Sequence, residues 1–179
     1  MISRRHVIAA VLIPLVPRIA LAQPTPSCGK PTAPQTAGPF FKPSSPLRSS
    51  LLDKDSSGPR LVLTGSVLSR DCKPVASAVL DFWHADEFGE YDNTGFRYRG
   101  HQFTDAQGRY RLATIVPAEY PGRARHIHVK AQAPGKRVLT TQLYFPGDPG
   151  NAKDGLYEPA LEMRLAKAAE GIFDFVVEA

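Results

Sequence analysis

The sequence predicts an all-β fold, a mainly antiparallel β-sandwich with long loops and an extended N-terminal arm. Short runs of β-branched and aromatic residues recur along the chain, and clusters of Gly, Pro and Asp separate them. Short strands punctuated by turns at regular intervals are typical of sandwiches and barrels. The expected strands are residues 61–68, 78–83, 109–115, 126–132, 138–145 and 172–177.

The remaining segments complete this organisation. Residues 23–59 are rich in Pro, Ser, Thr and Gly, and they predict an extended arm laid over a single domain of residues 60–179. Leu161–Ala169 is the one helix-like stretch, and Gly171 would end that helix.

Two connections between the expected strands are long, Ala85–Thr104 and Val116–Arg125. Loops on a rigid β scaffold are where binding and catalytic residues usually lie. A functional site is therefore expected where these two loops meet.

The first 22 residues have the layout of an export signal. Two adjacent arginines precede an apolar run, residues 7–16, and residues 20–22 form a small-residue A-L-A exit. The arginine pair in SRRHVI matches the twin-arginine type, with cleavage after Ala22. A buried N-terminal helix is the alternative, but two prolines within the segment weigh against it. We therefore expect an exported protein, periplasmic or secreted.

The charge of the chain argues against nucleic-acid and anionic-membrane binding. Lys and Arg number 22 against 17 Asp and Glu, a net charge of +5, and three of the arginines lie in the first 22 residues, which hold no acid. The rest is nearly neutral and lacks the concentrated basic patch that such binding requires. No later run reaches the ~18 apolar residues of a membrane-spanning helix. No stable membrane insertion is expected after signal cleavage.

Two cysteines, Cys28 and Cys72, lie in loop-like surroundings. In an oxidising compartment they would pair and tie the arm to the loop after the first strand. Two separate thiols are equally compatible with the sequence. The Cys-x-x-Cys and Cys/His spacings of zinc sites are absent from it.

The clearest chemical signal is the run RHIHVK, in which one residue separates His126 from His128. Alternate residues of a strand share a face, so both imidazoles project the same way and the apolar residues beside them point to the other face. Such a pair suits a metal held against a sheet, although H-x-H also occurs on ordinary surface strands. We interpret His84 and His101 as surface or hydrogen-bonded histidines.

Two tyrosines in the long loops extend this candidate metal site. Tyr91 follows the strand that ends at Trp83, and Tyr120 lies in a Pro-flanked turn six residues before His126. A free phenol has a pKa of about 10, so only a strong Lewis acid keeps it ionised at neutral pH. Zinc sites more often use Cys, His and carboxylate, and non-haem Fe(II) oxygenases use two His and one carboxylate. Two Tyr with two His therefore point to Fe(III), although spacing alone does not single out the tyrosines.

Four motifs carry a resemblance to a known family: PQTAGPFF in the arm, CKPVASAVLDFWHADEFGEYD, TDAQGRYRLATIVPAEYPGRARHIHVK and LTTQLYFPGDP. The stretch from Val67 to Asp148 that holds the last three resembles the intradiol ring-cleavage dioxygenases, the family of protocatechuate 3,4-dioxygenase and catechol 1,2-dioxygenase. Several motifs in one order make this match more specific than H-x-H alone. It implies a β-sandwich with a mononuclear non-haem Fe(III). With O2 as co-substrate, the enzyme would cleave a catechol-type ring between its two hydroxyl-bearing carbons to give a muconate-type diacid.

By motif position, the resemblance implies four metal ligands. Tyr91 and His128 would be equatorial, and Tyr120 and His126 axial. The resemblance further implies that Tyr120 leaves the metal when the catechol binds and acts as a base for its hydroxyl groups.

Two further residues match active-site positions of the family, Arg123 as its arginine and Gln142 as its glutamine. Each candidate also has a purely structural interpretation. Tyr91 would pack on Trp83, and Tyr120 would be a structural tyrosine at a corner, hydrogen-bonded to the backbone. Arg123 would pair with Glu119, and Gln142 would make hydrogen bonds to backbone groups only.

Two rival functions stay open at this point. One is a non-catalytic, transthyretin-like sandwich module that binds an aromatic ligand or a partner, and the other is Cu or Zn at the Tyr/His site. The sequence lacks the long helical N-terminal region through which catechol-type members dimerise. A homo-oligomer is therefore left open, as is the substituent on the catechol.

Overall fold

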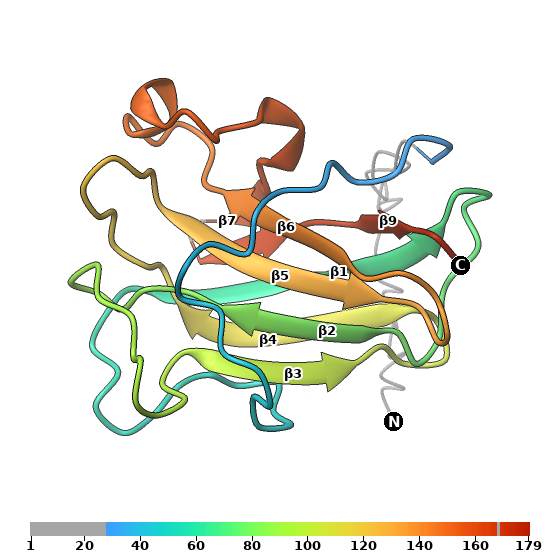
Figure 1. Ribbon diagram of the computed structural model, residues 1–179, viewed down its shortest axis with the longest axis horizontal. Helices are drawn as coiled ribbons and strands as arrows, with labels where there is room; N and C mark the ends of the chain where they lie inside the picture. Colours follow the sequence, from blue (N-terminus) through green and yellow to red (C-terminus); the bar gives the residue numbers. More distant parts are fainter. Residues whose placement is uncertain (1–27, 168) are drawn as a thin grey trace, which may run out of the picture.

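Two β-sheets form the computed structural model, which describes residues 28–167 and 169–179. Its strands are β1 (Arg60–Ser69), β2 (Val79–Trp83), β3 (Arg99–Phe103), β4 (Arg109–Ile115), β5 (His126–Gln132), β6 (Leu139–Tyr144), β7 (Arg164–Lys167), β8 (Glu170–Ile172) and β9 (Phe175–Val177). One sheet has the order β4–β1–β8–β7, with β9 also paired to β1, and the other has the order β3–β2–β5–β6 (Figure 1). The predicted sandwich is confirmed. The export signal expected at residues 1–22 lies outside the described residues.

The hydrophobic core lies between the sheets and is built from alternate residues of their strands. Ile127 and Val129 of β5 are fully buried in it, as is Phe82 of the neighbouring β2. Because side chains of a strand alternate between its faces, His126 and His128 project from the opposite face of this sheet. The core packing of β5 therefore fixes the direction of both imidazoles.

The helix expected at Leu161–Ala169 is wrong. A short 3-10 helix, η2 (Pro159–Leu161), is followed by strand β7, which pairs antiparallel with β8. Helix propensity is a weak preference, and the backbone hydrogen bonds offered by a sheet edge override it. Gly171 ends no helix: it lies in β8, where an added Cβ would come within 2.8 Å of the Met163 sulfur.

Two other features of the strands differ from the sequence prediction. β3 lies inside the connection expected to be a loop, and its sequence RGHQF shows no apolar alternation. At Gly100 an added Cβ would come within 2.8 Å of Arg48, so the arm packs directly on this strand. The run expected as one strand at 172–177 is divided between β8 and β9. Between them, Asp174 accepts a hydrogen bond from the Ser66 backbone N–H (2.8 Å).

The arm crosses the outer face of the sheet β3–β2–β5–β6 (Figure 1). Its Gln35 N–H donates to the Thr140 carbonyl of β6 (2.8 Å), and its Arg48 N–H donates to the His101 carbonyl of β3 (2.9 Å). The arm is thus hydrogen-bonded to both edge strands of this sheet, and it covers the face from which His126 and His128 project.

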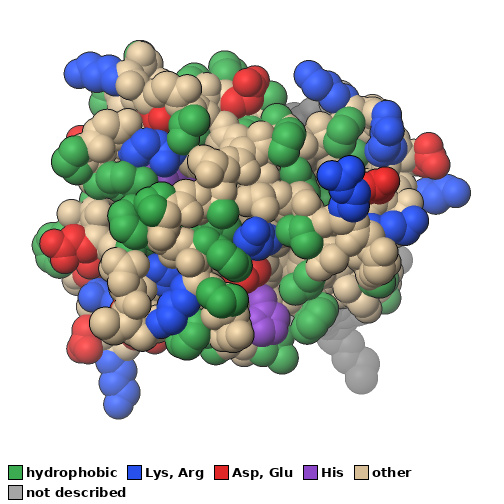
Figure 2. Space-filling view, in the orientation of Figure 1, with side chains coloured by type: hydrophobic (Ala, Val, Ile, Leu, Met, Phe, Trp, Pro, Cys, Tyr) green, Lys and Arg blue, Asp and Glu red, His purple; other side chains and the backbone are tan. Residues whose placement is uncertain are grey.

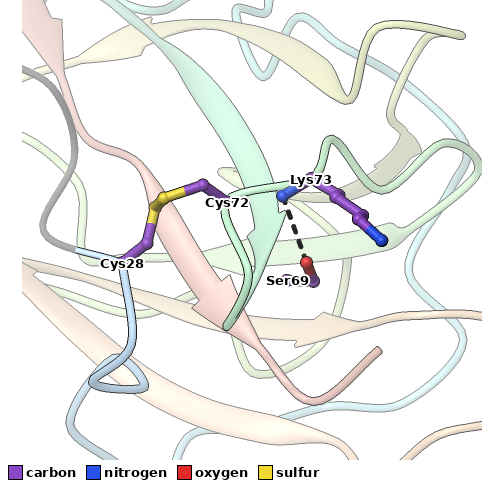
Figure 3. Close-up of a disulfide and its surroundings, with 4 residues drawn as sticks. All are labelled: Cys28, Ser69, Cys72 and Lys73. Carbon is purple, nitrogen blue, oxygen red and sulfur yellow. Dashed lines mark hydrogen bonds between the residues drawn. A yellow bond between two sulfur atoms is a disulfide. The ribbon is translucent and has the colours of Figure 1, made fainter.

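A disulfide joins Cys28 at the start of the described arm to Cys72 in the turn after β1, with a Cα–Cα distance of 5.3 Å (Figure 3). The turn itself is closed by the Lys73 N–H, which donates to the Ser69 hydroxyl (3.1 Å). Of the two alternatives that the sequence left open, the structure has the paired cysteines.

The surface agrees with the nearly neutral charge of the domain. On the face shown in Figure 2, Lys and Arg side chains lie at several separate places, with Asp, Glu and apolar side chains among them. Over the described ranges, the structure has no helix of the length and apolarity that crossing a membrane requires.

Candidate metal centre and active site

The site is built on the outer face of the sheet β3–β2–β5–β6. In the strand register, His128 of β5 lies between Trp83 at the end of β2 and Gln142 of β6. His126, one strand period earlier, lies opposite Tyr144. These neighbours stand side by side because cross-strand partners of an antiparallel pair share a face.

The loops bring the two predicted tyrosines to this face. The Tyr91 hydroxyl lies 3.3 Å from His126 Nε2, and His126 Nε2 lies 3.1 Å from His128 Nε2. The ring of Tyr120 is centred 5.7 Å from His126 and 5.9 Å from Tyr91. All four residues that the sequence singled out as metal ligands are therefore gathered in one cluster.

Hydrogen bonding orients one imidazole. His126 Nδ1 lies 2.7 Å from the Ala124 carbonyl oxygen, which can only accept, so Nδ1 carries the proton and Nε2 presents its lone pair to the cluster. Burial, and next the charge of Arg123, lower the pKa of His126 to about 4. Burial and then His126 also lower the pKa of His128 well below its ordinary value. Both rings are therefore neutral at pH 7, as metal ligands must be.

Tyr91 is held in a tightly bonded loop. The carboxylate of Asp92 accepts hydrogen bonds from the backbone N–H groups of Gly95 and Arg97. The buried guanidinium of Arg99 donates to the Asp92 carbonyl (3.0 Å) and to the Phe40 carbonyl of the arm (2.7 Å). The Tyr91 ring stacks on Phe40 with centroids 4.5 Å apart. It does not pack on Trp83, as the alternative interpretation of Tyr91 expected.

The Tyr91 phenol is neutral in this environment. Burial, and next the neighbouring Tyr120, raise the pKa of Tyr91 well above its ordinary value. A cation at the cluster would counter both effects and favour the phenolate.

The two functional loops touch each other at Gly89. Its φ is +86°, and an added Cβ would lie 2.6 Å from the Glu119 carbonyl oxygen and 3.4 Å from Tyr120. Only glycine combines this left-handed backbone with so close an approach. This contact sets the position of the Tyr120 loop relative to the Tyr91 loop.

Arg123 and Gln142 lie together beside the cluster. One terminal nitrogen of Arg123 donates to Gln142 Oε1, and the other lies 3.3 Å from the Tyr120 hydroxyl. Gln142 Nε2 donates to the Thr36 carbonyl of the arm (3.0 Å). The carboxylate that pairs with Arg123 is Asp154, at 3.0 Å, and not Glu119. Gln142 bonds both a side chain and the backbone.

Sequence reasoning missed three residues that support the site. Trp83 stacks on His128, Asp154 pairs with Arg123, and the Tyr144 hydroxyl donates to Gln35 Oε1 of the arm (3.1 Å). A signal existed for Tyr144, which follows Gln142 by two residues and so shares its face. For Asp154 there was none, because it lies in an irregular loop.

The donor set of the cluster fits a hard cation. In the described part of the chain, no group of three or more His, Cys, Asp or Glu side chains could hold a metal ion, so the donors here are two imidazole nitrogens and two phenol oxygens. Phenolate is a hard anionic ligand, and the soft thiolates that favour Cu(I) are absent from the cluster. The fold and this cluster define a class of protein, a β-sandwich that carries a cluster of two tyrosines and two histidines under its arm and loops.

Comparisons with known proteins identify the family. The family model described as "Dioxygenase" matches residues 36–171. Chlorocatechol 1,2-dioxygenase of Pseudomonas sp. (strain P51) is 31% identical in an alignment 175 residues long, which covers 81% of this chain and 70% of that protein. The protocatechuate 3,4-dioxygenase beta chain of Burkholderia cepacia is 38% identical in an alignment 120 residues long, which covers 56% of this chain and 51% of that one. The chain therefore spans between about half and 70% of the length of these relatives.

Solved structures agree. The dioxygenase domain of a dioxygenase carbohydrate-binding protein fusion from the cellulolytic bacterium Streptomyces sp. SirexAA-E is 56% identical, with a TM-score of 0.81 over 84% of this chain and 99% of that domain. The 3-chlorocatechol 1,2-dioxygenase of Rhodococcus opacus 1CP is 29% identical, with a TM-score of 0.75 over 85% of this chain and 73% of the other. The chain belongs to the intradiol ring-cleavage dioxygenases, a family of oxidoreductases.

Proposed function

We propose that this protein is an exported dioxygenase that uses a non-haem Fe(III) to open a catechol-type ring between its two hydroxyl-bearing carbons, giving a muconate-type diacid. The observation that carries the proposal is the convergence of two phenols and two imidazoles, with the Tyr91 hydroxyl 3.3 Å and His128 Nε2 3.1 Å from His126 Nε2. Tyr91, Tyr120, His126 and His128 would hold the iron.

The residues of the chain have distinct tasks in this proposal. Bound Fe(III) would supply the Lewis acidity that ionises the phenols and orients the catechol toward O2. Tyr120 would accept a proton from a catechol hydroxyl. Arg123 lies 3.3 Å from the Tyr120 hydroxyl, where it would stabilise negative charge that develops on the ring. Both oxygen atoms of O2 enter the diacid, so the reaction needs no external reductant.

The named relatives support this substrate class. They are a chlorocatechol and a protocatechuate dioxygenase, and both names describe dihydroxylated rings with a further substituent. The same comparisons do not favour a non-catalytic, transthyretin-like binding module.

Iron loading and oxygen uptake test the proposal together. Tyrosinate bound to Fe(III) should give the purified protein an intense visible absorption band. Iron-loaded protein should consume one O2 for each catechol, and the product spectrum should be that of a muconate rather than of an extradiol product. An iron-loaded sample that is colourless would refute the ligand assignment. Absence of oxygen uptake with catechol, protocatechuate, hydroxyquinol and chlorinated or alkylated catechols would refute the activity.

We also propose export by the twin-arginine route. The supporting observations are the SRRHVI motif and the disulfide Cys28–Cys72, because structural disulfides persist mainly in oxidising compartments. Replacing Arg4 and Arg5 by Lys should leave the precursor in the cytoplasm, and fractionation of the producing cells measures this. Equal periplasmic amounts of the variant and the wild type would contradict the route.

A further inference from the structure

We infer that Asp154 is the positioning residue of the active site: it holds the guanidinium of Arg123 so that its terminal nitrogens face Tyr120 and Gln142. This inference deepens the proposed function and rests on it, since Arg123 acts there on the catechol ring. The hydrogen-bond partners of the Asp154 side chain among the described residues are Arg123, Ala124 and Leu156, none of them an expected metal ligand, so its role would be indirect.

The contact between the two side chains is specific to one edge of the guanidinium. Arg123 Nε lies 3.1 Å from Asp154 Oδ1 and 3.0 Å from Oδ2. The carboxylate therefore takes the Nε edge and leaves both terminal nitrogens free for other partners. Those nitrogens lie toward the Tyr120 hydroxyl at 3.3 Å and toward Gln142 Oε1. Rotation about the Arg123 side chain would break the bonds on both edges together.

Asp154 is itself rigidly held. Its Oδ2 accepts from the Ala124 N–H (3.0 Å) and its Oδ1 accepts from the Leu156 N–H (2.9 Å). The Asp154 side chain is fully buried and that of Arg123 is 14% exposed. The carboxylate thus connects the loop that follows Tyr120 to the loop after β6, and it fixes both in one geometry.

The charges of the pair are matched. Burial alone would raise the pKa of Asp154, but the backbone donors and Arg123 outweigh it and lower that pKa. Burial would likewise lower the pKa of Arg123, but Asp154 together with Tyr120 and Tyr144 outweighs it and raises that pKa. Both groups are charged at neutral pH. Loss of the carboxylate would leave a largely buried guanidinium without a counter-ion, which would drive it toward solvent and away from the cluster.

The chain offers a matched control in Asp148, on the same loop. Its side chain is 2% exposed, it pairs with Arg125 at 3.4 Å, and it accepts from the Gly150 N–H at 2.7 Å. Arg125 is 47% exposed and lies outside the Tyr/His cluster. Asp148 therefore resembles Asp154 in being buried and paired with an arginine, but its partner is Arg125 and not Arg123.

The test compares Asp154→Asn with Asp148→Asn in the iron-loaded enzyme. In the wild type, each oxygen of the Asp154 carboxylate accepts one backbone N–H and the Arg123 Nε–H. In Asp154→Asn an amide NH2 would face these donors in place of one oxygen, so the two-oxygen, charge-assisted contact with Arg123 would be lost. We expect kcat/KM for a catechol to fall roughly 10- to 100-fold, with iron content and the visible band of the resting protein retained. Both variants should lower the melting temperature to a similar extent, because each disturbs a buried carboxylate paired with an arginine. Asp148→Asn should nevertheless keep kcat/KM within about twofold of wild type.

A double-mutant cycle shows whether Asp154 acts through Arg123. If it does, Arg123→Leu/Asp154→Asn should have the kcat/KM of Arg123→Leu alone, because coupled residues are not additive. Wild-type kcat/KM in Asp154→Asn, an equal loss in Asp148→Asn, or independent multiplication of the two losses would overturn the inference.

The crystal structure of Asp154→Asn separates this inference from the proposed function. Arg123 should no longer reach Gln142 and Tyr120, and an unmoved guanidinium would overturn the positioning role. If the wild type opened no catechol, the proposed function would fail, and the orientation of Arg123 in this variant would still decide whether Asp154 positions it.

Discussion

The indole of Trp83 and the imidazole of His128 lie nearly parallel, with their planes 5° apart and their centroids separated by 4.8 Å. The ring of Phe41 from the arm also packs against Trp83, with centroids 4.9 Å apart and planes at 61°. The arm also approaches His128 directly, since an added Cβ at Gly38 would lie 3.4 Å from the imidazole. His128 thus stacks on a residue of the neighbouring strand and lies close to the backbone of the arm. Packing rather than hydrogen bonding orients this imidazole, because the buried His128 Nδ1 has no hydrogen-bond partner among the described residues.

Loss of the stacking ring should weaken iron binding. Trp83→Leu removes the flat surface that orients His128, so we expect iron affinity to fall roughly 10-fold, measured by competition with a chelator. Trp83→Phe should restore most of it. The control is Phe175→Leu, which replaces a fully buried aromatic of the other sheet. Phe175→Leu and Trp83→Leu should each lower the free energy of unfolding by about 2 kcal/mol, but Phe175→Leu should not change iron affinity. Equal iron affinity in Trp83→Leu and Phe175→Leu would show that the stack has no role in binding.

The two kinds of proposed ligand should respond differently to substitution. Tyr120→Phe removes one phenol, so the visible band should shift and turnover should slow at least 10-fold, while the other three ligands keep the iron. His128→Ala should lose the iron, measured by metal analysis after dialysis.

Matched variants are Tyr110→Phe and His101→Ala. The Tyr110 hydroxyl donates to the Phe173 carbonyl between the sheets (2.8 Å), and His101 Nδ1 bonds Ser45 of the arm. Both controls should keep iron and colour. Retention of wild-type iron, colour and rate in both Tyr120→Phe and His128→Ala would mean that the residue roles are wrong.

Stability should fall in mild acid because of His84. Its ring lies 2.6 Å from the Ala85 carbonyl and 2.6 Å from the Thr114 hydroxyl, and burial lowers its pKa to about 4. In the unfolded chain the ordinary pKa is about 6.5, so between pH 6.5 and 4 the unfolded state binds more protons and is favoured. This one group should cost about 2 kcal/mol between pH 7 and 4.5.

Urea unfolding of the wild type and of His84→Gln at the two pH values measures this difference. Between pH 7 and 4.5, the free energy of unfolding of His84→Gln should fall by about 2 kcal/mol less than that of the wild type. Carboxylates with lowered pKa values, such as Asp154, lose their contribution mainly below pH 4.5 and so affect the comparison little. An identical pH dependence in the two proteins would refute the assignment to His84.

The disulfide should stabilise the fold and fix the start of the arm. Cys28 and Cys72 are 44 residues apart in the sequence, and closing a loop of that length in the unfolded state contributes about 4 kcal/mol in the chain-entropy description. Cys28→Ser/Cys72→Ser should therefore lower the free energy of unfolding by up to that amount. Amide hydrogen exchange should rise in residues 29–34 while β5 stays protected. An unchanged denaturation midpoint would show that non-covalent contacts of the arm suffice.

Local sequence patterns allowed most of the sandwich to be predicted, because runs of apolar and β-branched residues indicate strands. The pattern of β5 also gave the direction of His126 and His128, since a period of two leaves no other choice once Ile127 is in the core. Edge elements escaped this reasoning. β3 has a polar sequence, and β7 has helix-favouring residues; both become strands only because a neighbouring strand offers backbone hydrogen bonds.

Residue types at short separation were enough to predict the fold class and the pair His126 and His128. The order of several motifs carried the family resemblance, which implied the roles of Tyr91, Tyr120, Arg123 and Gln142. Only the tertiary structure decided which carboxylate pairs with Arg123, which ring supports His128, and that the arm covers the cluster. Asp154 lies 31 residues from Arg123, and Trp83 lies 45 residues from His128. Contacts over such separations follow from strand register and loop packing, whose free energy is shared by the whole sheet rather than carried by any local segment.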